Sequence, residues 1–140
     1  MITHILPENF SPKMNVVACF IICDGKFLLL KRSPKDSHGK KWGLPAGSVD
    51  EGENEYEAIL REISEESGIH VNKEDIAYNG WHYVRQKIDF FYHTFITSLG
   101  RLPEVRLSRE HTDYRWVTPE EALKMDLLTD LDACIREFFS

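Results

Sequence analysis

The apolar and polar positions in the first third of the chain predict a buried hairpin. Residues 16–23 are an unbroken apolar run rich in β-branched side chains, which is typical of a strand buried on both faces. Asp24-Gly25 then gives a turn signal, and residues 27–31 supply the expected partner strand. Residues 33–41 are polar and basic and indicate a surface loop. The chain therefore opens with an antiparallel pair followed by a polar loop.

The clearest helix is predicted over residues 54–67. Asn54 can cap its first turn, Glu57 three residues later completes a capping box, and Gly68 stands where helices usually stop. The apolar positions of this segment fall on one side of a helical wheel, so that side is expected to face the core. The helix is therefore predicted to be amphipathic, with defined ends.

The rest of the chain mixes strands and helices. Strands are expected over residues 76–84, 88–98 and 114–117, a short helix is expected to start at Thr118-Pro119, and an amphipathic helix over 129–139. This order indicates an α/β (α+β) fold, in which helices pack around a mixed sheet. We expect a single domain over residues 1–140, with residues 1–13 as an N-terminal extension or an edge segment.

Three glutamates share one arc of the predicted helix. At about 100° per residue, Glu62, Glu65 and Glu66 fall within an arc of about 100° beside the apolar face. Like charges three and four residues apart repel each other, and Arg61 is expected to point away from them toward solvent. A solvated acidic face is one interpretation. The other is a hard divalent cation, which prefers such oxygen ligands and would relieve the repulsion.

Composition narrows the class of protein. The chain has 140 residues, enough to bury a core, and its formal net charge of -6 argues against nonspecific nucleic-acid binding. Cys19, Cys23 and Cys134 lack metal-ligand spacing and are expected to be buried reduced thiols. There is no signal-peptide pattern at the start, and the longest apolar run is too short to span a membrane. We therefore expect a cytoplasmic protein with no membrane partner.

The segment around the glutamates carries a specific motif. Its fixed positions are Gly47, Glu53, Arg61-Glu62, Ile63, Glu65-Glu66, Gly68 and Ile69. They match every defined position of the Nudix box, and the seven fixed Gly, Glu and Arg residues would coincide by chance on the order of 10⁻⁸ per start position. The chain therefore resembles the Nudix hydrolases, over roughly residues 16–123. Ala46 is a small departure, since many members have glycine there.

The resemblance implies a fold and a metal site. The fold would be a Nudix-type α/β/α sandwich with a mixed sheet, in which the box forms a loop, a helix and a second loop. Mg²⁺ or Mn²⁺ would be held by the carboxylates of the motif and by a backbone carbonyl at its start: Gly47, Glu62, Glu65 and Glu66. Glu53 and Arg61 would form a supporting ion pair that anchors the loop to the helix.

The resemblance also implies the chemistry. A metal-activated water would attack phosphorus, and the expected catalytic residues are Glu62, Glu65 and Glu110. Glu62 is the first candidate for the general base. A glutamate of a distal loop is the alternative, and here that is Glu110, with His111 and Asp113 as rivals.

Substrate contacts are less defined by the sequence. Arg32 and Lys40 are candidates for phosphate binding, although surface lysines are a common alternative. Trp81 and Tyr83 are selected for base or sugar recognition from a set that also includes His82, Phe90 and Tyr92, although core aromatic residues are the common alternative. The expected reaction is hydrolysis of a pyrophosphate bond in a nucleoside diphosphate linked to another group, with nucleoside triphosphates favoured. The alternatives are a nucleotide-sensing module without turnover and an isomerase of isoprenoid diphosphates. The expected partner is a small-molecule nucleotide and no stable nucleic acid, and the chain could be a monomer or a homodimer.

Overall fold

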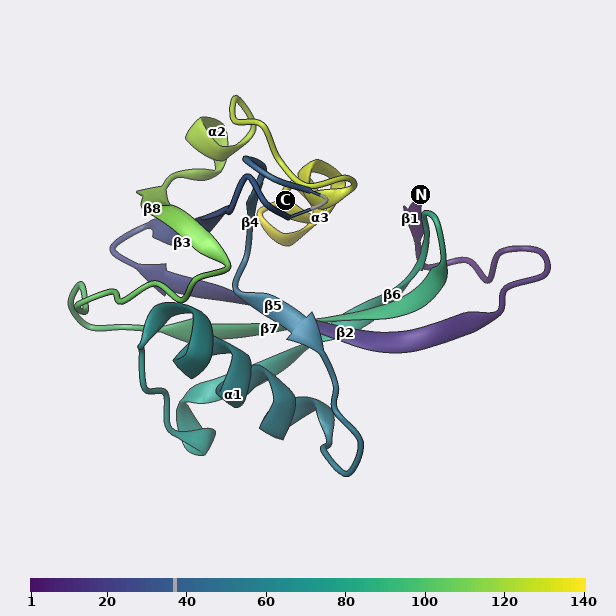
Figure 1. The fold of residues 1–140 in the computed structure, drawn as a ribbon, viewed down its shortest axis with the longest axis horizontal. Coiled ribbons are helices and arrows are strands. Elements are labelled where there is room, and N and C mark those ends of the chain that lie inside the picture. Colours follow the sequence, from purple (N-terminus) through teal and green to yellow (C-terminus); the bar gives the residue numbers. More distant parts are fainter. Residues whose placement is uncertain (37) are drawn as a thin grey trace.

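A computed structural model describes residues 1–36 and 38–140 (Figure 1). Over this part of the chain, eight strands form one mixed sheet, in the order β1-β6-β7-β2-β3-β4, with β5 paired to β2 and β8 paired to β3. The elements are β1 (Ile2–Thr3), β2 (Pro12–Cys23), β3 (Lys26–Arg32), β4 (Trp42–Gly43), β5 (Ala46–Ser48), α1 (Glu55–Ser67), a 3₁₀ turn (Lys73–Asp75), β6 (Ile76–Arg85), β7 (Asp89–Ser98), β8 (His111–Val117), α2 (Pro119–Ala122) and α3 (Leu131–Phe138).

The predicted hairpin is confirmed at β2 and β3. Asp24 and Gly25 both have positive φ, 56° and 77°, as a tight two-residue hairpin turn requires. The two strands stay paired only beside this turn, where Ile22 faces Phe27 and Cys23 faces Lys26. Beyond that point β3 pairs with β4 and β8, while β2 pairs with β5. The sheet therefore splits, and β5 enters the gap.

The strand β2 organises the sheet because both of its edges are occupied. It runs parallel to β7 from Pro12 to Ile22, whereas the other strand pairs are antiparallel. This parallel pair makes the sheet mixed, as predicted. Strand β1 is a short edge strand formed by residues 2–3 of the N-terminal segment, and it pairs with β6.

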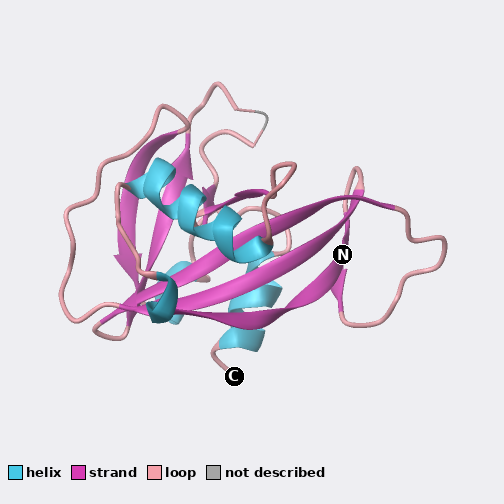
Figure 2. Cartoon of the chain, turned by 90° about the horizontal axis from the view of Figure 1, so that it is seen from below, coloured by secondary structure: helices cyan, strands magenta, loops and turns pink. Residues whose placement is uncertain are grey.

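Alternate residues of β2 and β3 enter two different cores. Val17, Cys19 and Ile21 pack with Ile59 and Ile63 of α1 on one face of the sheet. On the other face, the alternate side chains pack with α2 and α3; these are Ala18, Phe20, Phe27 and Leu29. Figure 2 shows α1 lying across the sheet, with the C-terminal helix on the far side. The α/β/α layering expected from the sequence is thereby confirmed.

The C-terminal elements are shorter than their sequence signals. The capping box at Thr118 and Glu121 is present, but α2 ends at Ala122. The helix α3 begins at Leu131, not at Thr129, because Asp130 has a left-handed φ of 72°. None of the helices in the described ranges is long and apolar enough to cross a membrane.

Candidate active site

The helix α1 has the ends that its sequence predicts. The Asn54 side chain accepts a hydrogen bond from the Glu57 N–H, and the Glu57 side chain accepts one from the Asn54 N–H, each at 2.9 Å. Gly68 ends the helix in the left-handed conformation, φ 72°, and its N–H donates to the Ser64 carbonyl. Ile59 and Ile63 are fully buried. These apolar contacts fix the rotation of α1, so its carboxylates face strand β5.

Gly47 allows β5 to approach the glutamate helix closely. A Cβ atom at this position would lie 2.2 Å from both Cδ and Oε1 of Glu62, which no folded chain tolerates without a shift. Gly47 is held in place on its other side, because it pairs with Val17 in the centre of the sheet. The missing side chain therefore makes room for a carboxylate.

Glu66 is the most enclosed of the three box glutamates. Its residue is 4% exposed, and its Oε1 accepts a hydrogen bond from the Ala46 N–H at 3.0 Å. Its carboxyl group lies beside that of Glu62, and the pair is expected to keep one proton at neutral pH when no cation is present. Burial, followed by the negative charges of Glu62 and Glu110, raises the pKa of Glu66 well above its ordinary value. Burial likewise raises the pKa of Glu62.

Arg61 does not point away from the glutamates, and the sequence expectation was wrong on this point. Its Nε and one terminal nitrogen hold both oxygens of Glu53, at 2.7 and 2.9 Å. Its other terminal nitrogen donates to Glu62 at 2.8 Å and to Glu65 at 3.3 Å. The long side chain bends back along the helix, a reach that a wheel of Cβ directions does not represent. Its hydrogen bonds, with one from the Asp50 N–H, lower the pKa of Glu53 to about 2.

The turn before β8 brings two more groups to the same place. Glu66, Glu110 and His111 each offer a ligand atom, and these atoms lie within 4.8 Å of one another. His111 is buried, and its Nδ1 has no hydrogen-bond partner within the described part of the chain. Burial, with the nearby charge of Arg32, lowers the pKa of His111 to about 4. The imidazole is therefore neutral at physiological pH.

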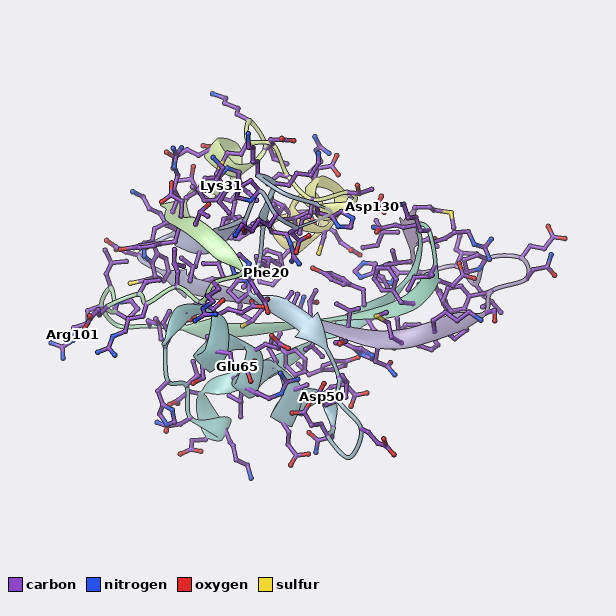
Figure 3. The ribbon with its side chains drawn as sticks, viewed as in Figure 1. Phe20, Lys31, Asp50, Glu65, Arg101 and Asp130 are labelled. Atoms are coloured by element: carbon purple, nitrogen blue, oxygen red, sulfur yellow. The ribbon has the colours of Figure 1, made fainter. Side chains whose placement is uncertain are left out.

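Glu66 and Glu110 line a cleft with a volume of about 880 Å³. Its lining carries Gly47, Glu62, Glu65, Glu66 and Glu110, together with Arg61 and Arg32. The lining also includes apolar side chains together with polar ones; the apolar ones are Ile2, Met14, Val16, Val84, Phe90, Tyr92 and Leu131, and the polar ones are Gln86, Lys87, Thr129 and Asp130. Figure 3 shows Glu65 on α1 and Asp130 near α3, on opposite sides of the sheet, and both residues line the cleft. Glu65 lies at the rim, with its side chain 59% exposed.

The structure places the four residues predicted to contact substrate in different regions. Arg32 lines the cleft, whereas Lys40 is not among the described residues that do so. Trp81 and Tyr83 lie away from it, in an aromatic cluster with Phe91 on the opposite face of β6. This placement corrects the expectation for both aromatic residues.

The correction for Trp81 and Tyr83 has a structural cause. A register shift between Tyr78 and Gly80 inserts an extra residue into β6, and Gly80 has a φ of 110°. An extra residue reverses which later side chains face which side of a sheet. Phe90 and Tyr92 of β7 take the cleft side instead. Nothing in the local sequence apart from the glycine signals the bulge.

The fold and the site can now be compared with those of known proteins. The family model described as "NUDIX domain" matches residues 12–139. The chain belongs to the Nudix family. As a Nudix hydrolase it is an enzyme that acts on pyrophosphate bonds of nucleotides.

This Nudix protein is similar to several named proteins and solved structures. It is 37% identical over 117 residues to the mouse (Mus musculus) bis(5'-nucleosyl)-tetraphosphatase [asymmetrical], covering 80% of this chain and 77% of the relative. It is 30% identical over 124 residues to the Escherichia coli nucleoside triphosphatase NudI, covering 80% and 86%. The structure of a C. elegans Ap4A hydrolase binary complex superimposes with a TM-score of 0.73 at 26% identity, covering 89% and 94% of the two chains. A MutT protein from Methanosarcina mazei gives a TM-score of 0.74 at 28% identity, covering 91% and 94%.

The carboxylate cluster fits a divalent cation. Glu62 and Glu66 offer carboxylate oxygens to the same part of the cleft, and hard cations take such ligands. Arg61 neutralises Glu62 but does not contact Glu66, which forms no ion pair within the described ranges. A cation between these carboxylates would replace the shared proton. The donor set, rather than family membership alone, thus indicates a metal-binding site.

Gly47→Ala tests the close approach of β5 to α1. The added Cβ must displace the Glu62 carboxylate, so we expect the free energy of unfolding to fall by about 1–3 kcal/mol, as overpacking usually costs, and hydrolysis to fall sharply. Gly100→Ala is the matched control, because a Cβ at Gly100 meets nothing within 4 Å. Urea denaturation and a hydrolysis assay measure the two effects. Equal behaviour of both variants would contradict the assigned contact.

Glu66→Gln tests the buried carboxyl group in metal-free protein. A raised native pKa gives a contribution to stability that is complete below the unfolded pKa and is lost as pH rises toward the native pKa. With a chelator present, wild-type stability should therefore fall between about pH 5 and about pH 8, by at most about 1.4 kcal/mol per pH unit for one group. Glu66→Gln should flatten this slope, and Glu74→Gln, at an exposed position, should not. An unchanged slope in Glu66→Gln, measured by urea denaturation, would rule out the assignment.

Proposed function

We propose that this protein hydrolyses dinucleoside tetraphosphates in a reaction that depends on a divalent cation, Mg²⁺ or Mn²⁺. The carrying observation is the cleft itself, in which a carboxylate cluster and a group of apolar and aromatic side chains line one space of about 880 Å³. A substrate with a polyphosphate chain and nucleosides at its ends matches this combination. Asymmetrical cleavage of such a chain by water gives a nucleoside monophosphate and a nucleoside triphosphate.

The cation would be held by the box. Glu62, Glu65, Glu66 and the Gly47 carbonyl would hold it. When bound, a divalent ion stabilises negative charge on the phosphate oxygens and makes a bound water more acidic. Glu53 and Arg61 position the ligands: Arg61 holds Glu62 at 2.8 Å, and Glu53 anchors Arg61 through both oxygens.

Glu110 is the proposed general base. Its side chain makes no hydrogen bond or ion pair within the described ranges, whereas Glu62 is engaged by Arg61 and Glu66. Glu110 is exposed to the cleft and lies within reach of Glu66 and His111. An unengaged carboxylate can take a proton from the attacking water as the bond to phosphorus forms. His111, neutral and buried behind it, fits a positioning role better than a base.

Arg32 is the proposed phosphate contact. Its terminal nitrogen binds Asp36 at 2.8 Å, but its Nε is buried and has no partner in the described ranges. The Arg32 side chain is 27% exposed and lines the cleft, so its guanidinium can meet a phosphate oxygen there. Phe90 and Tyr92, in place of Trp81 and Tyr83, would contact the base or sugar from the cleft lining.

Nucleoside triphosphates, which the sequence favoured, are the second candidate substrate. The similarity to the triphosphatase NudI supports them. The greater identity to the tetraphosphatase of mouse supports the dinucleoside reading, and so do the apolar and aromatic side chains that line the cleft together with the carboxylates. A dinucleoside tetraphosphate is therefore the first candidate substrate.

A substrate comparison tests this proposal. With Mg²⁺ present, we expect kcat/KM for diadenosine tetraphosphate to exceed that for ATP by at least about tenfold, which corresponds to about 1.4 kcal/mol of additional transition-state binding. Chromatography should show AMP and ATP as the products. ATP as the better substrate would replace this proposal with the second candidate. Turnover that persists in excess chelator would refute the cation dependence.

Glu110→Gln tests the base assignment. Loss of a general base typically costs about 10²–10⁴-fold in rate, so kcat should fall by this amount while KM and Mg²⁺ affinity stay near their wild-type values. Glu104→Gln is the matched control, since Glu104 is an exposed residue of the same loop whose partner is Arg106. If Glu110→Gln weakens Mg²⁺ binding instead, Glu110 is a ligand, and the base must be Glu62.

A further inference from the structure

A second group of ligand-type side chains lies apart from the carboxylate cluster. His4 follows strand β1, His82 lies in β6, and Glu137 lies near the end of α3. Each offers one ligand atom, and the three atoms lie within 4.8 Å of one another. Three segments that are distant in sequence thus bring two imidazoles and a carboxylate to a single point.

The two imidazoles face the same carboxylate. Glu137 Oε1 is hydrogen-bonded to Nε2 of His4, and its Oε2 to Nε2 of His82. The two rings lie against each other, with centroids 4.1 Å apart and an interplanar angle of 32°. Nδ1 of His82 is buried and has no hydrogen-bond partner within the described ranges. The side chains of His4, His82 and Glu137 therefore form one connected cluster.

The surroundings give this group both an enclosed side and an entrance. It borders a cavity of about 230 Å³, which Asn79, Thr94 and Cys134 also line. The His82 side chain is 10% exposed, whereas those of His4 and Glu137 are 60% and 48% exposed. An ion can therefore reach the three ligand atoms from the His4 side and meet the sheet behind them.

We propose that His4, His82 and Glu137 form a second metal site, which binds a transition-metal ion such as Zn²⁺. Two imidazole nitrogens and one carboxylate oxygen are a ligand set that suits Zn²⁺ and leaves a fourth position for water. The all-oxygen cluster of Glu62 and Glu66 suits a hard cation instead. The two sites therefore differ in the ions they prefer.

The proposed site would fasten the N-terminal segment to the body of the enzyme. Strand β1 has only two residues, paired through Ile2 with Val84 and through Thr3 with Tyr83. Ile2 lines the substrate cleft, and His4 stands two residues after it. An ion shared by His4 and Glu137 would hold this wall of the cleft against α3, and it would stabilise the folded state, which alone brings the ligands together.

Zinc titration of chelator-stripped full-length protein tests this site. Excess Mg²⁺ occupies the carboxylate cluster, and calorimetry should then show about one Zn²⁺ per chain, with a rise in melting temperature. Co²⁺ in place of Zn²⁺ should give the visible absorption of a four-coordinate ion, which an octahedral oxygen site does not give. His4→Ala and Glu137→Gln should each weaken binding by more than about 100-fold, because even the outer partners of metal ligands contribute about 10–100-fold.

His70→Ala is the matched control, since His70 is an exposed histidine after α1, and it should bind Zn²⁺ as the wild type does. His4 is largely exposed, so His4→Ala should fold; if it does not, Glu137→Gln decides. No Zn²⁺ uptake by the wild type, or equal uptake by both site variants, would overturn the proposal. So would a melting temperature that responds to pH but not to Zn²⁺, which indicates hydrogen bonds only. These readouts do not involve hydrolysis and are independent of the proposed function.

Discussion

The buried contact between Glu62 and Glu66 is the constraint on which the rest of the site depends. Two carboxylates that lie side by side at the inner end of a cleft are not both ionised unless a cation lies between them, and without the cation the pair keeps a proton. Arg61 engages Glu62 but leaves Glu66 to a single backbone N–H, that of Ala46. The folded chain thus holds an acidic pair whose charge is incomplete without a metal ion. Catalytic use of that ion follows from where the pair is placed.

The split sheet determines that placement. Strands β2 and β3 separate just beyond their turn, and β5 fills the edge of β2 that β3 leaves. Gly47 of β5 then meets Glu62 of α1 without a side chain in between. The same separation carries β8 and the turn before it toward the cleft, which brings Glu110 to Glu66 from 44 positions farther along the chain. Backbone topology therefore assembles the site from three segments: β5, α1 and the turn before β8.

The sequence predicted the parts of this account that depend on local pattern. The caps of α1, the arc shared by Glu62, Glu65 and Glu66, and the mixed sheet follow from spacing, and the Nudix box follows from its motif. Three features could not be predicted from the sequence. A helical wheel cannot show that the Arg61 side chain bends back along the helix. The bulge near Gly80 reverses the faces on which Trp81 and Tyr83 lie. The cluster of His4, His82 and Glu137 depends on tertiary structure alone. Each depends on side-chain reach or strand register, which local periodicity does not encode.

Proton release during Mg²⁺ binding is the most direct measurement of the central claim. If the ion replaces the proton shared by Glu62 and Glu66, calorimetric titration in buffers of different ionisation enthalpy should show about one proton released per ion bound near neutral pH. The released fraction should diminish as pH rises toward the raised pKa of Glu66. Mg²⁺ binding with no proton release at neutral pH would contradict the account, because both carboxylates would then already be ionised in the metal-free protein.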